Sequence, residues 1–277
     1  KVGGMAEILF IPEDFDDLVT LLKIKPKGTN ITIIGNASNL LVRDDGIPGI
    51  VIILGKSFSH IRKLKNNEII CGGSLQNKKL SSYALNNNIG GLAFLSNIPG
   101  TIGGSVKMNS GAHGYQISDI LIKVNLLDSN GDLMERSLSD LIFEYRKSSI
   151  SDDSICVSVN IRGHLSTREK ILKEISSFKS QRISSQPITE KTGGSTFKNP
   201  TDRKAWQLIQ EAGCADMPVG DACISKLHSN FIINRGYANA YQIELLGENI
   251  RKVVMEKTGV DLEWEIRRLG HGPSINL

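Results

Sequence analysis

The run NIPGTIGGSVKMNSGAHG, residues 97–114, constrains the fold most, because it places five glycines and a single charge in eighteen residues. Glycine reaches positive φ angles easily and lets another molecule approach the main chain closely. Flexible linkers are usually polar and rich in Gly and Ser, whereas Ile102 and Val106 are among the apolar residues spaced through this run. The run therefore predicts a rigid loop whose backbone amides bind an anionic group such as a diphosphate.

A second loop of similar character, GNASNLLVRDDG, spans residues 35–46 and follows a predicted strand. Ser38 and Asn39 place a hydroxyl and an amide beside bare backbone, and the acids Asp44 and Asp45 come only at its end. From composition alone, a pair of ordinary turns stays open as an alternative for the two loops. The apolar residues in both loops, and the lack of acids where a diphosphate would lie, favour an anion site.

The composition is that of an ordinary globular protein of 277 residues, with 40% hydrophobic and 22% charged residues. The net charge of +4 favours an anionic ligand, but Lys and Arg are spread along the chain, which argues against nucleic-acid binding. No apolar run approaches the ~18 residues that spanning a bilayer needs, so no membrane contact is expected. The four cysteines form no CxxC pair, and reduced thiols in a cytoplasmic protein are expected.

Several common motifs are absent from the sequence. There is no GxGxxG for a Rossmann dinucleotide site and no GxSxG elbow. The five histidines show no HxxxH spacing, and zinc needs clustered ligands. We therefore expect no metal site.

Hydrophobic periodicity predicts helices over residues 14–23, 75–88, 167–181, 205–213 and 238–258. Short apolar segments predict strands at residues 31–35, 50–54, 69–73, 230–234 and 262–270, and DSNG at 128–131 predicts a hairpin turn. Strands and helices do not alternate regularly, as a parallel sheet would require, so the fold class predicted is α+β.

Five motifs follow one another in a specific order along the chain. They are IIGNASNLLVRDDG (33–46), FLSNIPGTIGGSVKMNSGAHG (94–114), EYRKSS (144–149), GGSTFKNP (193–200) and LEWEIRRLG (262–270). Through these motifs the chain resembles the UDP-N-acetylenolpyruvoylglucosamine reductases, which are flavoenzymes of peptidoglycan precursor synthesis, over nearly its whole length. It is similar to their shorter form, which lacks an inserted loop with a substrate-covering tyrosine.

The resemblance implies a two-part FAD-binding fold of the PCMH type, with subdomains at residues 1–55 and 56–163. A C-terminal α+β substrate-binding domain is expected at residues 164–277. The two glycine loops would then hold FAD. The cofactor-binding residues implied are Gly35, Asn36, Ala37, Ser38, Asn39, Leu40, Pro99, Gly100, Thr101, Gly103, Gly104, Asn109, Gly111 and Ala112.

The sequence departs from the family pattern at four positions in these loops. Ala37 and Asn97 stand where glycines are common, Ala93 where the family often has Glu, and His113 where it often has an aromatic residue. Asn tolerates the left-handed region, so Asn97 is expected to keep a left-handed turn, whereas the Cβ of Ala37 restricts positive φ. We expect the flavin site to differ from the family's in fine geometry.

The resemblance implies a reaction in which NADPH reduces FAD, and an enolpyruvyl UDP-sugar is then reduced to a lactyl ether. Arg146 matches the arginine that polarises the substrate carboxylate, Ser195 the proton donor to C2, and Glu265 the carboxylate near C2. From the residues alone, Arg146 is typical of a surface arginine and Ser195 of a turn serine. Strand alternation does not choose between Glu263 and Glu265, and the family motif chooses Glu265.

Further residues are implied to contact the substrate, and NADPH is expected to use the same pocket in turn. The enzyme is expected to act as a monomer on a small-molecule substrate. The implied substrate-binding residues are Tyr145, Arg182, Lys198, Asn199, His228 and Asn230.

Two other functions stay open from the sequence. An oxidase on the same flavin fold, acting on an alcohol, could hold FAD covalently through a His or Cys near the flavin loops, and His113 lies in such a loop. A flavin-binding module without activity is the other alternative, suggested by Ala37 and Ala93. The joint presence of Arg146, Ser195 and Glu265 argues against lost activity.

Overall fold

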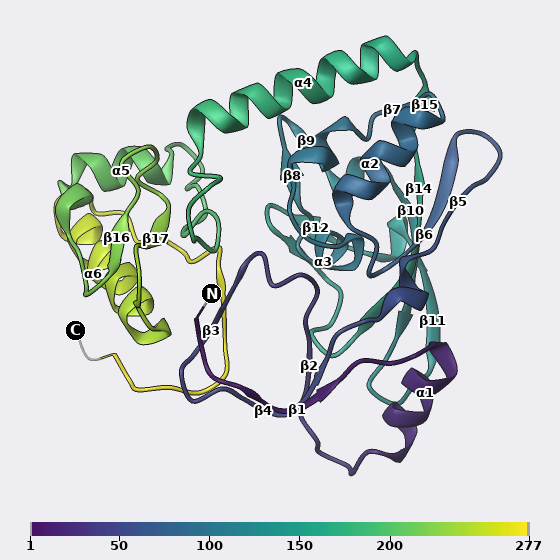
Figure 1. Ribbon diagram of the computed structural model, residues 1–277, viewed down its shortest axis with the longest axis horizontal. Coiled ribbons are helices and arrows are strands. Elements are labelled where there is room, and N and C mark those ends of the chain that lie inside the picture. The colour runs from purple at the N-terminus through teal and green to yellow at the C-terminus, as the bar shows by residue number, and fades with distance from the viewer. Residues whose placement is uncertain (1, 276–277) are drawn as a thin grey trace. The chain divides into compact units, whose positions relative to one another are not determined.

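The computed structural model describes residues 2–275 (Figure 1). Two compact units emerge from the contacts within the chain. The glycine-loop unit comprises residues 8–37 and 49–181, and the C-terminal unit comprises residues 1–7, 38–48 and 182–277. The chain therefore passes between the units three times before residue 50 and once more near residue 181. The three-region division expected from the sequence stays a prediction.

A five-stranded antiparallel sheet forms the centre of the glycine-loop unit (Figure 1). The predicted DSNG turn joins two of its strands, and three backbone N–H groups of that turn donate to the side chain or carbonyl of Asp128. The hairpin prediction is therefore confirmed. In spatial order the strands are β11 (Leu133–Ser137), β10 (Leu121–Leu127), β14 (Ile155–Arg162), β6 (Glu68–Gly72) and β5 (Ile61–Lys63).

Two helices, α2 (Asn77–Asn86) and α3 (Ile102–Lys107), pack against this sheet through a buried apolar cluster. Leu80 of α2, Val106 of α3 and Val159 of β14 are each fully buried in it. Burial of this kind contributes about 1.5–3 kcal/mol per large aliphatic side chain. Helix α3, which lies within the second glycine loop, is therefore held by the core of this unit.

A smaller layer of the glycine-loop unit contains α1 (Phe15–Ile24). Asp14 caps the helix by accepting a hydrogen bond from the backbone N–H of Asp17, and Leu18 and Leu22 face the core. The neighbouring three-stranded sheet has the order β1 (Ala6–Phe10), β4 (Ile47–Ile52), β2 (Ile31–Ile33). The helix predicted at residues 14–23 is confirmed.

The C-terminal unit has its own core, built by α5 (Ala205–Glu211), α6 (Ala240–Thr258) and the hairpin of β16 (Ala222–Ile224) and β17 (Ile232–Asn234). Helix α6 starts at a capping box formed by Asn239 and Gln242 and ends at Gly259, whose φ is 71°. A parallel pair, β18 (Arg267–Leu269) with β3 (Leu40–Val42), joins the end of the chain to the first glycine loop.

The remaining elements are short, apart from α4 (Arg168–Ser185). They are η1 (Lys56–Ser59), η2 (Ala93–Asn97), η3 (Ile117–Asp119), η4 (Leu138–Asp140) and η5 (Cys214–Asp216), with the strand pairs β7 (Ile89–Gly90) and β15 (His164–Leu165), β8 (Gly111–Ala112) and β9 (Tyr115–Gln116), and β12 (Phe143–Glu144) and β13 (Lys147–Ser148).

The predicted α+β class is confirmed, because most strand pairs are antiparallel and helices lie between groups of strands. The last predicted strand, residues 262–270, is wrong in its extent. Only Arg267–Leu269 form a regular strand, while the preceding residues pair through one isolated bridge, Phe197 with Trp264. Across residues 2–275, we find no helix with the length and apolar character of a membrane span.

Candidate functional site

The two glycine loops approach each other within the glycine-loop unit. A Cβ atom on Gly35 would lie 2.6 Å from the Thr101 hydroxyl oxygen, so only glycine allows this approach. A Cβ on Gly104 would meet nothing nearer than that hydroxyl, at 3.6 Å, so the backbone is open there. Neither loop segment carries an acidic side chain at residues 35–37 or 97–104. These features suit a ligand that carries phosphate groups, as FAD does.

Hydrogen bonds hold the second loop in a single shape. Asn77 is fully buried, and its side-chain amide donates to the Ile98 carbonyl at 3.1 Å and to the Ser105 hydroxyl at 2.8 Å. The backbone N–H of Asn77 donates to Gly100, and that of Gly103 donates to Gly73. Sequence reasoning missed Asn77, because no local signal distinguishes a helical asparagine that contacts a distant loop.

Lys107, the one charged residue of the second loop, contacts protein groups, which argues against an anion-binding role. Its ammonium donates to the Ile150 carbonyl and lies 2.8 Å from an Asp152 carboxylate oxygen. The loop would therefore bind phosphate through backbone amides rather than through a lysine.

The backbone of the first loop is strained at Ala37, whose φ is 50°. A Cβ in this region costs roughly 1–2 kcal/mol, so the concern raised by the sequence at Ala37 is confirmed. The expectation of a left-handed turn at Asn97 is wrong. Asn97 ends η2 in a right-handed turn closed by the Ile98 N–H donating to Leu95, and Gly100, with φ of 114°, takes the left-handed conformation.

Arg146 lies at the turn of the hairpin formed by β12 and β13, with φ of 57°. Its guanidinium donates to the Gly111 carbonyl at 3.0 Å and lies over the Tyr145 ring, 4.8 Å from the ring centre. The predicted cation is therefore tied to the second glycine loop. Non-glycine residues at positive φ concentrate at functional sites, where the surrounding structure holds the strain.

Ser195 and Glu265 lie on two paired segments of the C-terminal unit. The Glu265 N–H donates to the Thr196 carbonyl at 2.8 Å, and the Lys198 N–H donates to the Glu263 carbonyl at 2.8 Å. This pairing brings together two residues that are seventy positions apart in the chain. Both side chains are half-buried, as expected for groups that meet a ligand.

The first glycine loop contributes Ser38 and Asn39 to the same unit. Asn39 donates through its side-chain amide to the Glu265 carbonyl at 2.8 Å, and its own carbonyl accepts from the Arg267 N–H. A Cβ on Gly194 would lie 3.8 Å from the Ser38 carbonyl oxygen. The structure therefore places Ser38 and Asn39 beside Ser195 and Glu265.

Asn230 is buried and fixes the Ser195 segment from the other side. Its side chain donates to the Phe197 carbonyl at 2.8 Å and accepts from the Phe197 N–H at 3.0 Å. Its own carbonyl accepts from Thr196 at 2.8 Å. His228 accepts the Asn230 N–H at its Nδ1 atom. Burial lowers the pKa of His228. These contacts hold the segment in place, and substrate contact by Asn230 and His228 stays a prediction.

Comparison with known proteins gives matches over both parts of the chain. Residues 6–137 match the family model described as FAD binding domain, and residues 186–269 match UDP-N-acetylenolpyruvoylglucosamine reductase, C-terminal domain. A reductase of that name from Novosphingobium aromaticivorans is 44% identical over 98% of this chain and 91% of its own length. One from Gluconobacter oxydans is 41% identical over 98% of this chain and 88% of its own length.

This chain belongs to the UDP-N-acetylenolpyruvoylglucosamine reductase family. The crystal structure of a family member from Thermus caldophilus has a TM-score of 0.83 at 32% identity, covering 95% of this chain and 92% of that one. The resemblance inferred from the five motifs is confirmed. The expected FAD-binding fold with a C-terminal domain, and FAD as cofactor, are confirmed as well.

Most of the other residues predicted to bind substrate form hydrogen bonds or ion pairs within the protein. The Lys198 ammonium pairs with Glu263, and the Asn199 side chain accepts the Ala205 N–H at 3.1 Å, at the start of α5. Arg182 donates to the Gln186 side chain at 3.1 Å, and burial lowers its pKa. Tyr145 is exposed beside Arg146. Whether these residues contact substrate stays a prediction.

His113, a departure from the family pattern, bridges the second loop and α4. Its Nε2 accepts from the Asn97 side chain at 3.2 Å, and its Nδ1 donates to Gln181 at 3.1 Å. Its ring stacks on Phe178 with centres 4.1 Å apart. Because both ring nitrogens are engaged, the structure gives no support to covalent flavin attachment at His113.

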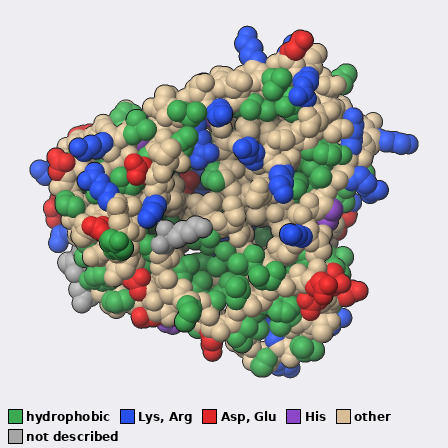
Figure 2. Space-filling view, viewed as in Figure 1, with side chains coloured by type: hydrophobic (Ala, Val, Ile, Leu, Met, Phe, Trp, Pro, Cys, Tyr) green, Lys and Arg blue, Asp and Glu red, His purple; other side chains and the backbone are tan. Residues whose placement is uncertain are grey.

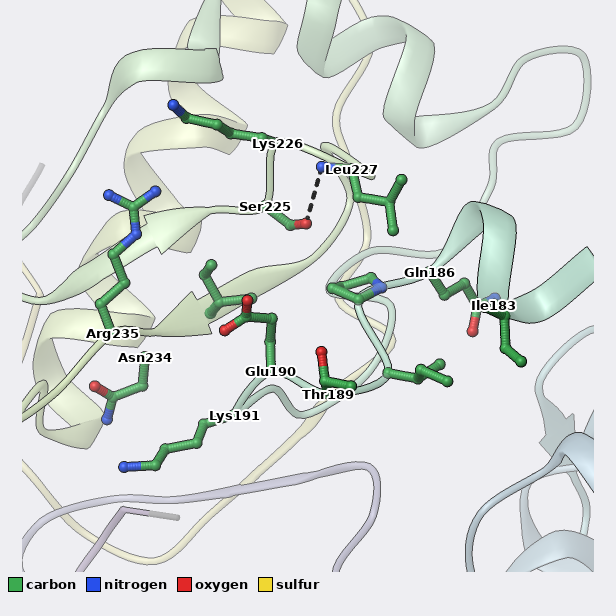
Figure 3. A pocket seen from close by; sticks show the side chains of 13 residues that line it. Ile183, Gln186, Thr189, Glu190, Lys191, Ser225, Lys226, Leu227, Asn234 and Arg235 are labelled. Atoms are coloured by element: carbon green, nitrogen blue, oxygen red, sulfur yellow. Dashed lines mark hydrogen bonds between the residues drawn. The ribbon is translucent and has the colours of Figure 1, made fainter.

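A pocket of about 730 Å³ lies in the C-terminal unit, at the end of α4 and β17 (Figure 3). Lys191, Lys226 and Arg235 line one side, and their side chains extend away from Leu227 and Ile183, which line the other. Glu190 also lines the pocket, so its lining combines three cations, a carboxylate and apolar side chains. The sequence did not point to it, because its cations come from three separated segments.

On the face of the molecule that Figure 2 shows, basic side chains do not gather into one patch. Figure 2 shows Lys and Arg scattered over the visible face. Within residues 2–275, no group of three or more His, Cys, Asp or Glu residues is arranged to hold a metal ion.

Proposed function

We propose that this chain is an FAD-dependent reductase that converts UDP-N-acetylglucosamine enolpyruvate to UDP-N-acetylmuramate with NADPH, in peptidoglycan precursor synthesis. The observation that carries the proposal is 44% identity to a reductase of this name over 98% of the chain. The FAD binding domain match and the two converging glycine loops support the flavin requirement.

Residues at the two glycine loops would hold FAD. In the glycine-loop unit, segments 35–37 and 99–104 carry no acidic side chain. The N–H groups of Ile102 and Gly103 already donate to Leu75 and Gly73, so a phosphate would be bound by other N–H groups of these segments. When bound, FAD would supply the hydride chemistry of the reaction between NADPH and C3 of the enolpyruvyl group. The chain itself would bind and orient the substrate and would supply the proton.

We propose that the Arg146 guanidinium binds the substrate carboxylate. Its planar fork suits a carboxylate, and charge that develops at C2 when hydride adds to C3 would spread into that carboxylate. The bond to the Gly111 carbonyl uses one N–H of the fork. This contact would set the orientation of the fork relative to the second glycine loop.

We propose that Ser195 gives the proton to C2 and that Glu265 faces C2 as the nearby carboxyl group. A serine hydroxyl is a weak acid, so the proton must be replaced from a neighbour after transfer. Glu265 lies on the segment paired with that of Ser195. Hydride at C3 and a proton at C2 together complete the reduction of the double bond.

The test is anaerobic visible spectroscopy on the purified, FAD-loaded protein. NADPH is expected to bleach the flavin band, and the enolpyruvyl UDP-sugar is expected to restore it. If the band bleaches and does not return, the substrate assignment is wrong. If the protein binds no flavin, the proposal fails at its first step.

We also propose that the enzyme acts as a monomer in the cytoplasm. The thiols of Cys71, Cys156, Cys214 and Cys223 are free in the structure, which fits a reducing compartment. Sedimentation at micromolar concentration would test the monomer, and a dimer mass would contradict it.

A further inference from the structure

We propose that Asn109 is a positioning residue that holds the Arg146 hairpin, the segment Phe143–Ser148, in its working shape. The proposal rests on the proposed role of Arg146. The sequence places Asn109 among the cofactor-binding residues, whereas its side chain in the structure is directed at the protein. Asn109 is only 1% exposed.

The side chain of Asn109 uses its full donor capacity on protein groups. Its amide donates to the Gln116 side-chain oxygen at 3.1 Å and to the Glu144 carbonyl at 3.0 Å. Its oxygen accepts from the Ser118 N–H at 3.2 Å. An asparagine has two N–H donors, so none is left for a ligand.

The bond to Glu144 acts at a sensitive point of the hairpin. The Glu144 carbonyl belongs to the peptide group that enters the turn at Tyr145 and Arg146, and Arg146 has φ of 57°. A two-stranded hairpin this short has little stability of its own. Its conformation therefore depends on bonds to other parts of the glycine-loop unit.

Two more bonds join the hairpin to the same loop. The Ser148 hydroxyl donates to the Lys107 carbonyl at 2.8 Å, and Arg146 donates to the Gly111 carbonyl at 3.0 Å. Together with Asn109, these contacts lie at the start, the turn and the end of the hairpin. The loop proposed to bind flavin and the arginine proposed to bind substrate are thus built as one piece.

The backbone of Asn109 explains why asparagine suits the position. Its φ is 42°, a region that asparagine tolerates better than most residues. Glycine tolerates it too, so Asn109→Gly removes the three side-chain bonds without adding backbone strain. Asn88 has φ of 57° and is exposed, so Asn88→Gly is a matched control.

The first readout is amide hydrogen exchange, which does not depend on activity. Asn109→Gly is expected to speed exchange at the Ser149 N–H, which donates to Ile142 across the hairpin, about fivefold, since a net hydrogen bond contributes about 1 kcal/mol. Exchange in α2 and in the Asn88→Gly protein is expected to stay unchanged. Unchanged exchange at Ser149 in Asn109→Gly would overturn the proposal.

The second readout separates the two half-reactions by stopped-flow. In Asn109→Gly, flavin reduction by NADPH and FAD retention are expected to change less than about threefold, while flavin reoxidation by substrate falls about tenfold. In an Arg146→Ala background, Asn109→Gly is expected to cause no further loss, because one residue acts through the other. Additive losses would overturn the positioning role.

These outcomes stay separate from the proposed function. If the wild-type protein does not reduce the enolpyruvyl UDP-sugar, the proposed function fails, while hydrogen exchange still decides whether Asn109 holds the hairpin. If turnover is normal and exchange at Ser149 is unaffected by Asn109→Gly, the further inference alone fails.

Discussion

The two units hold their candidate catalytic groups in different ways. In the glycine-loop unit, Arg146 lies on a short hairpin at positive φ, held by single hydrogen bonds with neutral partners: Asn109 donates to Glu144, and Arg146 donates to Gly111. In the C-terminal unit, Ser195 and Glu265 lie on paired backbone segments, with a buried amide on one side and a network of ion pairs behind. The first arrangement contains backbone strain and depends on a few hydrogen bonds, whereas the second is held by many hydrogen bonds and ion pairs.

The ion-pair network of the C-terminal unit connects α6 to the segment of Glu265. Glu244 accepts from Arg43 at 2.8 Å and from Arg268 at 3.0 Å, and Arg268 also contacts Glu248 at 2.8 Å. The Trp264 indole donates to Glu248 at 2.8 Å. Because Trp264 precedes Glu265 directly, the network fixes the segment that carries the candidate acid.

The largest effect is expected from Ser195→Ala, which removes a group of the C-terminal unit and leaves the glycine loops intact. Substrate-driven flavin reoxidation should fall about 10³-fold, as for loss of a proton donor. Flavin reduction by NADPH should stay nearly normal. Rapid-mixing absorbance measures both steps, and an equal loss in both would contradict the assigned role.

A large stability effect is expected from Asn230→Ala. The change leaves the N–H and the carbonyl of buried Phe197 without partners and should lower the free energy of unfolding by about 3 kcal/mol. Urea denaturation measures it. Asn125→Ala, which removes one half-buried side-chain bond to Ser158, is the control and should cost less than about 1 kcal/mol.

A pH dependence is expected from Glu244. Burial raises the pKa of Glu244, but the hydrogen bonds and charges of Arg43 and Arg268 outweigh burial, so the pKa lies below its ordinary value. A lowered pKa in the folded state gives stability that is present above the ordinary carboxyl pKa and lost as the pH falls through the folded value.

Glu244→Gln should therefore lower the free energy of unfolding by about 2 kcal/mol at pH 7, because Arg43 and Arg268 lose a charged partner. The difference between variant and wild type should shrink below about pH 4. Urea titrations from pH 3 to 7 measure it. A difference that does not vary with pH would contradict the electrostatic explanation.

The smallest effect is expected from Ala37→Gly in the first loop. Relief of the positive φ should exceed the entropy that glycine adds to the unfolded chain, for a gain of about 0.5–1 kcal/mol. Thermal unfolding of the apo-protein measures it. A loss of stability would show that Ala37 is not strained. Ala6→Gly, in strand β1, offers a control that should destabilise.

Much of the fold was predictable where the signal is local. The apolar face of α6, through Leu246 and Ile250, and the DSNG turn after β10 depend on residues close together in the chain. The five motifs were sufficient to predict the family and FAD. The extent of the last strand was wrong, because residues 262–266 bond to a loop rather than to a regular strand.

The sequence by itself determined the class of fold, the family and which residues to suspect. Only the tertiary structure decided what holds them: Asn39 reaches Glu265 across 226 positions, Asn230 reaches Phe197 across 33, and Asn109 reaches Glu144 across 35. The physical reason is that a side-chain amide has the same local pattern whether it bonds to a ligand or to a distant carbonyl. Its partner is chosen by how the chain packs, and no short stretch of sequence records that choice.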